Sequence, residues 1–153
     1  MNKIIRVLFF ILISSSVVAH AEEGGLSSLE IEVYRSPTCG CCGKWIEHLK
    51  ENNFIVKDYV TNDVKLIKDK YGVTDQMASC HTALVNGYVV EGHVPVADIR
   101  AMIKNKPSVL GISVPGMPVG TPGMGMGGRQ DPYQVVSFDK DQNYKVVNSY
   151  EGN

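Results

Sequence analysis

The first regular stretch of the chain, LEIEVYR at residues 29–35, alternates apolar and polar positions. Alternation places the apolar side chains on one face, so it predicts a half-buried β-strand. Pro37 ends this strand, and Trp45 and Leu49 then lie on the apolar side of a predicted amphipathic helix. FIVKDYV at residues 54–60 is rich in β-branched and aromatic residues and predicts a second strand.

The following pattern predicts a second helix, a hairpin and a third helix. Residues 61–63 offer N-cap side chains, and Gly72 is a natural end for the second helix. Asn86-Gly87 lies between two short apolar runs. Asn-Gly is the preferred pair for a two-residue hairpin turn. The order β-α-β-α-β-β-α, with a cysteine motif between the first strand and the first helix, predicts an α/β protein. We expect a thioredoxin-like core over residues 29–107.

The C-terminal third of the chain has a different composition. Residues 108–132 contain seven glycines and four prolines, together with three methionines, and predict a loop with almost no regular structure. In residues 133–153, YQVVSF and YKVVNSY flank the polar turn DKDQN. They predict an added β-hairpin that packs on the core.

The N-terminus has the features of a secretory signal peptide over residues 1–21. Lys3 and Arg6 precede a short apolar run, and residues 19–21, AHA, fit a cleavage site. A polar lead at 22–28 follows, and we expect a periplasmic protein with no membrane span after cleavage. Removing Lys3 and Arg6 takes the formal net charge from −1 to −3. No basic stripe is present, which argues against nucleic acid as a partner.

The four cysteines are placed poorly for holding a fold together. Cys39, Cys41 and Cys42 fall within four positions, so disulfides among them close almost no loop. Cys39 and Cys42 have CxxC spacing at the start of a predicted helix, where the helix dipole favours thiolate. Thiolate serves redox exchange and metal binding equally, so this spacing alone leaves both functions open.

Cys41 and Cys80 favour metal binding. A third thiol beside a redox pair would attack the mixed disulfide, whereas in a metal site it is another ligand. Soft thiolates select Cu(I), Zn(II) or iron–sulfur clusters, and crowded thiolates that bridge several ions suit Cu(I) best. Zinc is the competing metal, held by Cys39, Cys42, Cys80 and either Cys41 or His81.

The remaining soft or nitrogen ligands are less clearly placed. His81 follows Cys80 directly, and neighbours in an extended chain point to opposite faces, so a position at the surface or outside the ligand set stays open. Met117 lies between two prolines in a segment too rich in glycine to be core, and it is either a thioether ligand or an incidental loop residue. We expect His48 and His93 to lie in solvent.

Three motifs in this order resemble the periplasmic copper-resistance proteins of the CopG type: CGCC after a strand, SCHT before a hairpin and VPGMPVGTPGM after the last helix. The similarity runs from about Leu29 to Tyr150. It implies a thioredoxin-like fold, a copper–thiolate centre and service in copper detoxification, in which copper could change between Cu(I) and Cu(II). It carries the ligand role onto the following residues: Cys39, Cys41, Cys42, Cys80, His81 and Met117.

The sequence therefore predicts a copper-binding protein of copper resistance that holds one or more Cu(I) ions in a cysteine centre. Its partners would be copper ions and other periplasmic copper-handling proteins. Whether it is an enzyme, as a copper oxidoreductase, stays open. Two alternatives belong to other classes: a metal-free thiol–disulfide oxidoreductase that uses Cys39 and Cys42, and a copper chaperone without redox activity.

Overall fold

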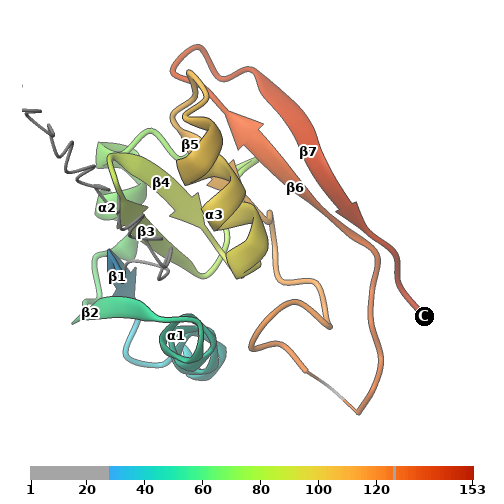
Figure 1. The fold of residues 1–153 in the computed structure, drawn as a ribbon. Coiled ribbons are helices and arrows are strands. Elements are labelled where there is room, and N and C mark those ends of the chain that lie inside the picture. Colours follow the sequence, from blue (N-terminus) through green and yellow to red (C-terminus); the bar gives the residue numbers. More distant parts are fainter. Residues whose placement is uncertain (1–27, 126) are drawn as a thin grey trace, which may run out of the picture.

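The computed structural model describes residues 28–125 and 127–153 (Figure 1). The predicted signal peptide at 1–21 and residues 22–27 of the predicted polar lead lie outside the described residues. The elements are β1 (Leu29–Arg35), α1 (Gly40–Glu51), β2 (Phe54–Val60), α2 (Val64–Lys70), β3 (His81–Val85), β4 (Tyr88–Glu91), α3 (Val96–Asn105), β5 (Gly111–Ser113), β6 (Tyr133–Phe138) and β7 (Tyr144–Tyr150). The first seven follow the predicted order β-α-β-α-β-β-α, so the α/β prediction is confirmed.

All seven strands form one mixed sheet in the order β2-β1-β3-β4-β5-β6-β7. β1 is parallel to β2 and antiparallel to β3. β3 and β4 form the predicted hairpin around Asn86-Gly87, with Val85 opposite Tyr88 and Thr82 opposite Glu91. The hairpin therefore returns the chain to the same end of the sheet at which β3 begins.

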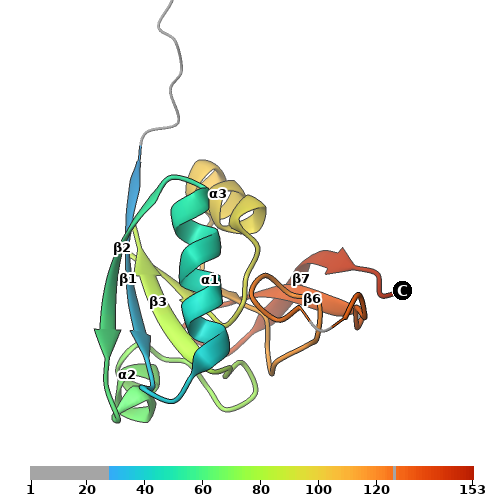
Figure 2. The ribbon, with the colours of Figure 1, turned by 90° about the horizontal axis from the view of Figure 1, so that it is seen from below.

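Helices cover the two faces of the sheet unequally. Figure 2 shows α1 and α3 on one face and the short helix α2 on the other. On the α1 side, Ile31 and Val33 of β1 pack with Trp45 and Leu49 in the larger core cluster. The indole Nε1–H of Trp45 donates to the carbonyl of Val94 (3.0 Å), which ties α1 to the segment that leads into α3. This core holds α1 against the sheet.

The segment 108–132 departs from its prediction at one point, because it contains β5. Gly111 begins this strand, which runs parallel to β4 with Gly111 opposite Val89. A Cβ atom at Gly111 would lie 2.0 Å from the carbonyl oxygen of Val89. Glycine is therefore required for the close approach of two strands here, rather than for a turn.

The C-terminal hairpin of β6 and β7 is present as predicted and extends the sheet through antiparallel pairing of β6 with β5. Val135, Val136 and Phe138 of β6 are buried, while β7 is exposed along most of its length at the edge of the sheet. No helix within the described residues has the length and apolar character needed to cross a membrane.

Candidate metal centre

The cysteine motif lies at the N-terminus of α1, as the sequence predicted. Cys39 is the N-cap residue, and Cys41 and Cys42 belong to the first turn. The side chain of Cys42 is fully buried against the core, whereas Cys39 and Cys41 are half-buried. A disulfide joins Cys39 and Cys42, whose Cα atoms are 5.4 Å apart. The Sγ atom of Cys41 lies 3.6 Å from that of Cys39, so the third thiol stands directly beside the bridge.

Cys80 approaches the same point from the sheet. It occupies a bend immediately before β3, and its carbonyl oxygen lies 4.0 Å from the Sγ atom of Cys42. The Sγ atoms of all four cysteines lie within 4.8 Å of one another. Two sulfurs bound to one ion by bonds of about 2.3 Å are at most about 4.6 Å apart. The structure thus gathers the four predicted cysteines into one cluster, close to the separation that a metal site needs.

His81 is part of the same cluster and is fully buried. Its Nδ1 atom lies 3.3 Å from the Sγ atom of Cys80, which the bend before β3 permits although the two residues are adjacent. The imidazole packs against the indole of Trp45 with ring centroids 4.3 Å apart. Its Nε2 atom has no hydrogen-bond partner within the part of the chain that the structure describes. The surface alternative for His81 is therefore wrong.

His93 corrects the sequence analysis, which expected it in solvent. It is buried, with 1% of its surface exposed, and its Nε2 atom lies 3.1 Å from the Sγ atom of Cys80. The Nδ1–H group donates to the carbonyl of Pro122 (2.7 Å), so the lone pair of Nε2 faces the cluster. The side chains of Cys42, Cys80, His81 and His93 form a second group with all donor atoms within 4.8 Å of one another.

A signal for His93 was available in the predicted hairpin. A two-residue turn at Asn86-Gly87 pairs Thr82 with Glu91, and two further residues along each arm bring His93 opposite Cys80. His48, the other histidine that was expected in solvent, is half-buried on α1.

The environment sets the protonation of the cluster. Burial raises the pKa of the Cys80 thiol to about 12, and the neighbouring Cys41 thiol adds to the shift. Burial also lowers the pKa of His81 well below its usual range, assisted by the nearby His93 and Lys68, and it lowers the pKa of His93. Both imidazoles are therefore neutral at pH 7, which is the form that binds metals, and a metal must displace the proton of Cys80.

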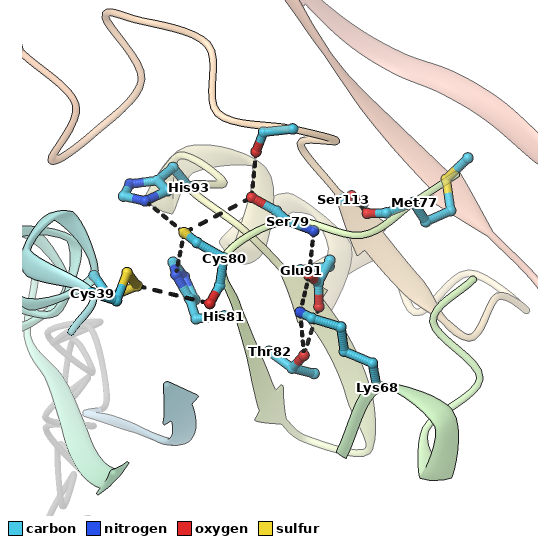
Figure 3. A network of polar contacts seen from close by, with 12 residues as sticks. Cys39, Lys68, Met77, Ser79, Cys80, His81, Thr82, Glu91, His93 and Ser113 are labelled. Atoms are coloured by element: carbon cyan, nitrogen blue, oxygen red, sulfur yellow. Dashed lines mark hydrogen bonds and ion pairs between the residues drawn. A yellow bond between two sulfur atoms is a disulfide. The ribbon is translucent and has the colours of Figure 1, made fainter. Parts of the chain in front are cut away.

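The glycine-rich segment, residues 108–132, is attached to the stretch that leads into Cys80. Figure 3 shows Ser79, which makes one of these contacts. The hydroxyl of Ser79 donates to the carbonyl of Gly116, and the N–H of Gly116 donates to the carbonyl of Ala78 (3.1 Å). These contacts hold the backbone of the predicted ligand Met117 beside the Cys80 segment. The side chain of Met117 itself is 57% exposed.

The fold and the cluster together define an α/β protein with a buried cysteine and histidine site that could hold a metal ion. A family model described as "Protein of unknown function, DUF411" matches residues 77–124, which include Cys80, His81 and His93. No curated protein matches the chain.

Two solved structures are similar over most of the chain, and both are described as copper resistance protein copG. One, form 1, is 47% identical with a TM-score of 0.78, and the match covers 82% of this chain and 99% of that chain. The other, form 2, is 46% identical with a TM-score of 0.77, and the match covers 80% and 98%. This chain belongs to the CopG family of copper resistance proteins.

Proposed function

We propose that this protein is a periplasmic, thioredoxin-like copper-binding protein of copper resistance that holds Cu(I) in a centre built from Cys39, Cys41, Cys42 and Cys80. The single observation that carries the proposal is the convergence of the four Sγ atoms within 4.8 Å, at the start of a helix that the core holds in place. Thiolate is a soft ligand that favours Cu(I), zinc or iron–sulfur clusters, and crowded thiolates that bridge several ions suit Cu(I) best. The description of the related structures as copper resistance proteins agrees with this choice.

The centre offers donors for more than one ion. Cys42 and Cys80 belong both to the group of four cysteines and to the group with His81 and His93. A thiolate shared between two groups can bridge two ions, which suits Cu(I) better than one tetrahedral zinc ion. The two neutral imidazoles add nitrogen donors beside the sulfurs. Zinc remains the competing metal because two cysteines and two histidines are also a common zinc ligand set.

The disulfide between Cys39 and Cys42 links copper loading to redox state. Its sulfurs carry no thiolate charge, so reduction by two electrons, with uptake of two protons, must precede binding at all four cysteines. Oxidation of the dithiol back to the disulfide supplies two electrons, one to each of two Cu(II) ions. This step releases two protons, forms the disulfide and yields two Cu(I) ions. In the other direction, the disulfide takes one electron from each of two Cu(I) ions and takes up two protons, which gives the dithiol and two Cu(II) ions. With both directions the centre would interconvert Cu(I) and Cu(II) as well as store copper.

Anaerobic titration with Cu(I) tests the binding proposal. The reduced protein should bind more than one Cu(I) per chain tightly, and the disulfide form should bind fewer ions because two sulfurs are blocked. Cys41→Ser should lower the affinity by at least about tenfold, since it removes one thiolate from the set. Thr38→Ser, an exposed neighbour outside the cluster, is the matched control and should leave binding unchanged. Equal stoichiometry and affinity in Cys41→Ser would refute the proposal.

A metal-free thiol–disulfide oxidoreductase is the second candidate, and the observed Cys39–Cys42 disulfide favours it. It predicts reduction of protein disulfides without copper, abolished by Cys39→Ser and retained in Cys80→Ser. The copper proposal predicts that Cys80→Ser weakens Cu(I) binding just as Cys39→Ser does, because Cys80 belongs to both ligand groups. A copper chaperone without redox activity would bind Cu(I) with the same cysteines but reduce no Cu(II). Measuring the Cu(I) formed per chain from added Cu(II) separates it from a copper oxidoreductase.

A further inference from the structure

A buried carboxylate lies on the α2 side of the sheet, beneath the segment that carries Cys80 and His81 (Figure 3). Glu91 of β4 is fully buried, and its Oε1 atom accepts the backbone N–H of Ser79 (2.6 Å). Its Oε2 atom accepts the hydroxyl of Thr82 (2.7 Å). The carboxylate therefore contacts the residue before Cys80 and the residue after His81.

Lys68 supplies the opposite charge from α2. Its Nζ atom forms an ion pair with Glu91 and donates to the hydroxyl oxygen of Thr82 (3.1 Å). Lys68 is the buried residue of this short helix, whose other lysines reach solvent. The one buried charged side chain of α2 therefore pairs with the carboxylate of Glu91.

Stability alone explains this network poorly. Removing two charges from water is costly, and replacing a buried ion pair with apolar residues of similar volume is often neutral or stabilising. The same face of the sheet carries an apolar cluster that includes Val73 and Met77, so apolar side chains are already packed on it. A role for the network is better sought in the backbone that it holds.

The other side-chain anchors of this segment act before the bend, whereas the backbone after the bend is held by strand pairing with β1 and β4. The hydroxyl of Ser113 donates to the carbonyl of Met77 (2.6 Å), and Gly116 contacts Ala78 and Ser79. Among the described contacts, the carboxylate of Glu91 bridges both sides of the Cys80–His81 pair. By holding Ser79 and Thr82 together, Glu91 fixes the bend through which the adjacent side chains of Cys80 and His81 face one site.

We propose that Glu91 is a positioning residue of the metal centre, which holds the Ser79–Thr82 segment so that Cys80 and His81 meet the cysteines of α1. This inference rests on the proposed copper-binding function. It predicts that the hydrogen-bond acceptor for Ser79 matters for copper binding, whereas the charge of the pair does not. Groups that orient metal ligands from outside commonly change metal affinity by about 10- to 100-fold when they are removed.

Two double variants separate the acceptor from the charge. Lys68→Met/Glu91→Gln removes both charges but keeps an amide oxygen for the N–H of Ser79. Lys68→Met/Glu91→Leu removes the charges and the acceptor at similar volume, and by the argument above it should remain folded. Asp98→Asn is the matched control, because Asp98 is a buried carboxylate that accepts from Tyr150 (2.6 Å) and Asn148 (2.8 Å) and takes no part in the cluster.

The measurement is anaerobic Cu(I) titration of each reduced protein against a chromogenic Cu(I) chelator, with the Cu(I)–thiolate absorption and emission recorded. We expect the leucine variant to lose at least about tenfold in Cu(I) affinity and to change its Cu(I)–thiolate spectrum. The glutamine variant should keep the affinity and spectrum of the unmodified protein. Asp98→Asn should lower the unfolding free energy without changing either copper signal.

Unchanged Cu(I) affinity and spectrum in the leucine variant would overturn the positioning role. A loss of Cu(I) affinity in Asp98→Asn as large as that in the leucine variant would overturn it too. If the leucine variant does not fold, Thr82→Val decides the question. It removes one of the two anchors without changing shape and should lower affinity by about threefold, the size of one net hydrogen bond. Unchanged affinity in Thr82→Val then overturns the role. Failure of the unmodified protein to bind Cu(I) is a separate result, which overturns the proposed function and this inference together.

Discussion

Gly123 is the point at which the glycine-rich segment rests on α1, and its substitution tests whether that segment is held against the candidate metal centre. Its φ angle is +83°, a conformation that side chains other than glycine adopt at a cost. A Cβ atom there would lie 2.7 Å from the backbone nitrogen of Trp45 and 3.1 Å from the carbonyl oxygen of Cys41. Both neighbours are helical backbone and cannot move without disturbing the first turn of α1.

The cost of Gly123→Ala follows from the two ways in which the chain can respond. If the segment stays in place, the left-handed conformation costs about 1–2 kcal/mol, and overpacking adds about 1–3 kcal/mol. If it detaches, His93 loses the carbonyl of Pro122, and a buried donor without a partner costs about 1–3 kcal/mol. The chain takes the less costly response, so we expect a loss of about 1–3 kcal/mol in the free energy of unfolding.

Urea unfolding of the reduced, metal-free protein measures this loss. Gly125→Ala is the matched control in the same segment, because a Cβ atom there would meet nothing within 4 Å. It should change the unfolding free energy by no more than about 0.5 kcal/mol. If Gly123→Ala is as stable as Gly125→Ala, the segment does not press on α1, and the reasoning about its attachment is refuted.

Two further predictions concern the same segment and the C-terminal hairpin. The sequence also predicts Met117 as a copper ligand, and Met117→Leu should then lower Cu(I) affinity by about tenfold or less, because a neutral thioether is a weaker ligand than a thiolate. Met124→Leu is the control, and equal Cu(I) titrations for the two variants would contradict the prediction for Met117. Tyr150 donates to Asp98 (2.6 Å), and burial, with this hydrogen bond, raises the pKa of its phenol. The unfolded chain therefore releases this proton first, so stability should be fully present below about pH 10 and fall as the pH rises above it. In urea unfolding, the free energy of unfolding of Tyr150→Phe should decrease less above pH 10 than that of the unmodified protein. The exposed control Tyr144→Phe should show the same decrease as the unmodified protein. An equally large decrease in Tyr150→Phe would contradict the role given to the Tyr150 phenol.

The order of the regular elements could be predicted because each has a strong local signal. The alternation in β1 and the Asn86-Gly87 turn reflect periodicity and turn chemistry, which act over a few residues. The sequence analysis missed β5 because this strand begins with Gly111, and glycine usually indicates a loop. The need for glycine at this position comes from a contact with another strand. The carbonyl of Val89, 2.0 Å from where a Cβ atom would stand, is a neighbour only after the strands have paired.

The same division holds for the candidate metal centre. Because Cys39, Cys41 and Cys42 share the start of one helix, their local spacing was enough to predict thiolate chemistry there. Their proximity to Cys80, the burial of His93 and the carboxylate of Glu91 were decided by tertiary structure. His93 looked like a solvent residue because local polarity says nothing about what covers a side chain. The hairpin returns it to Cys80, and the segment beyond β5 closes over both, so burial and ligand geometry arise only when distant segments pack together.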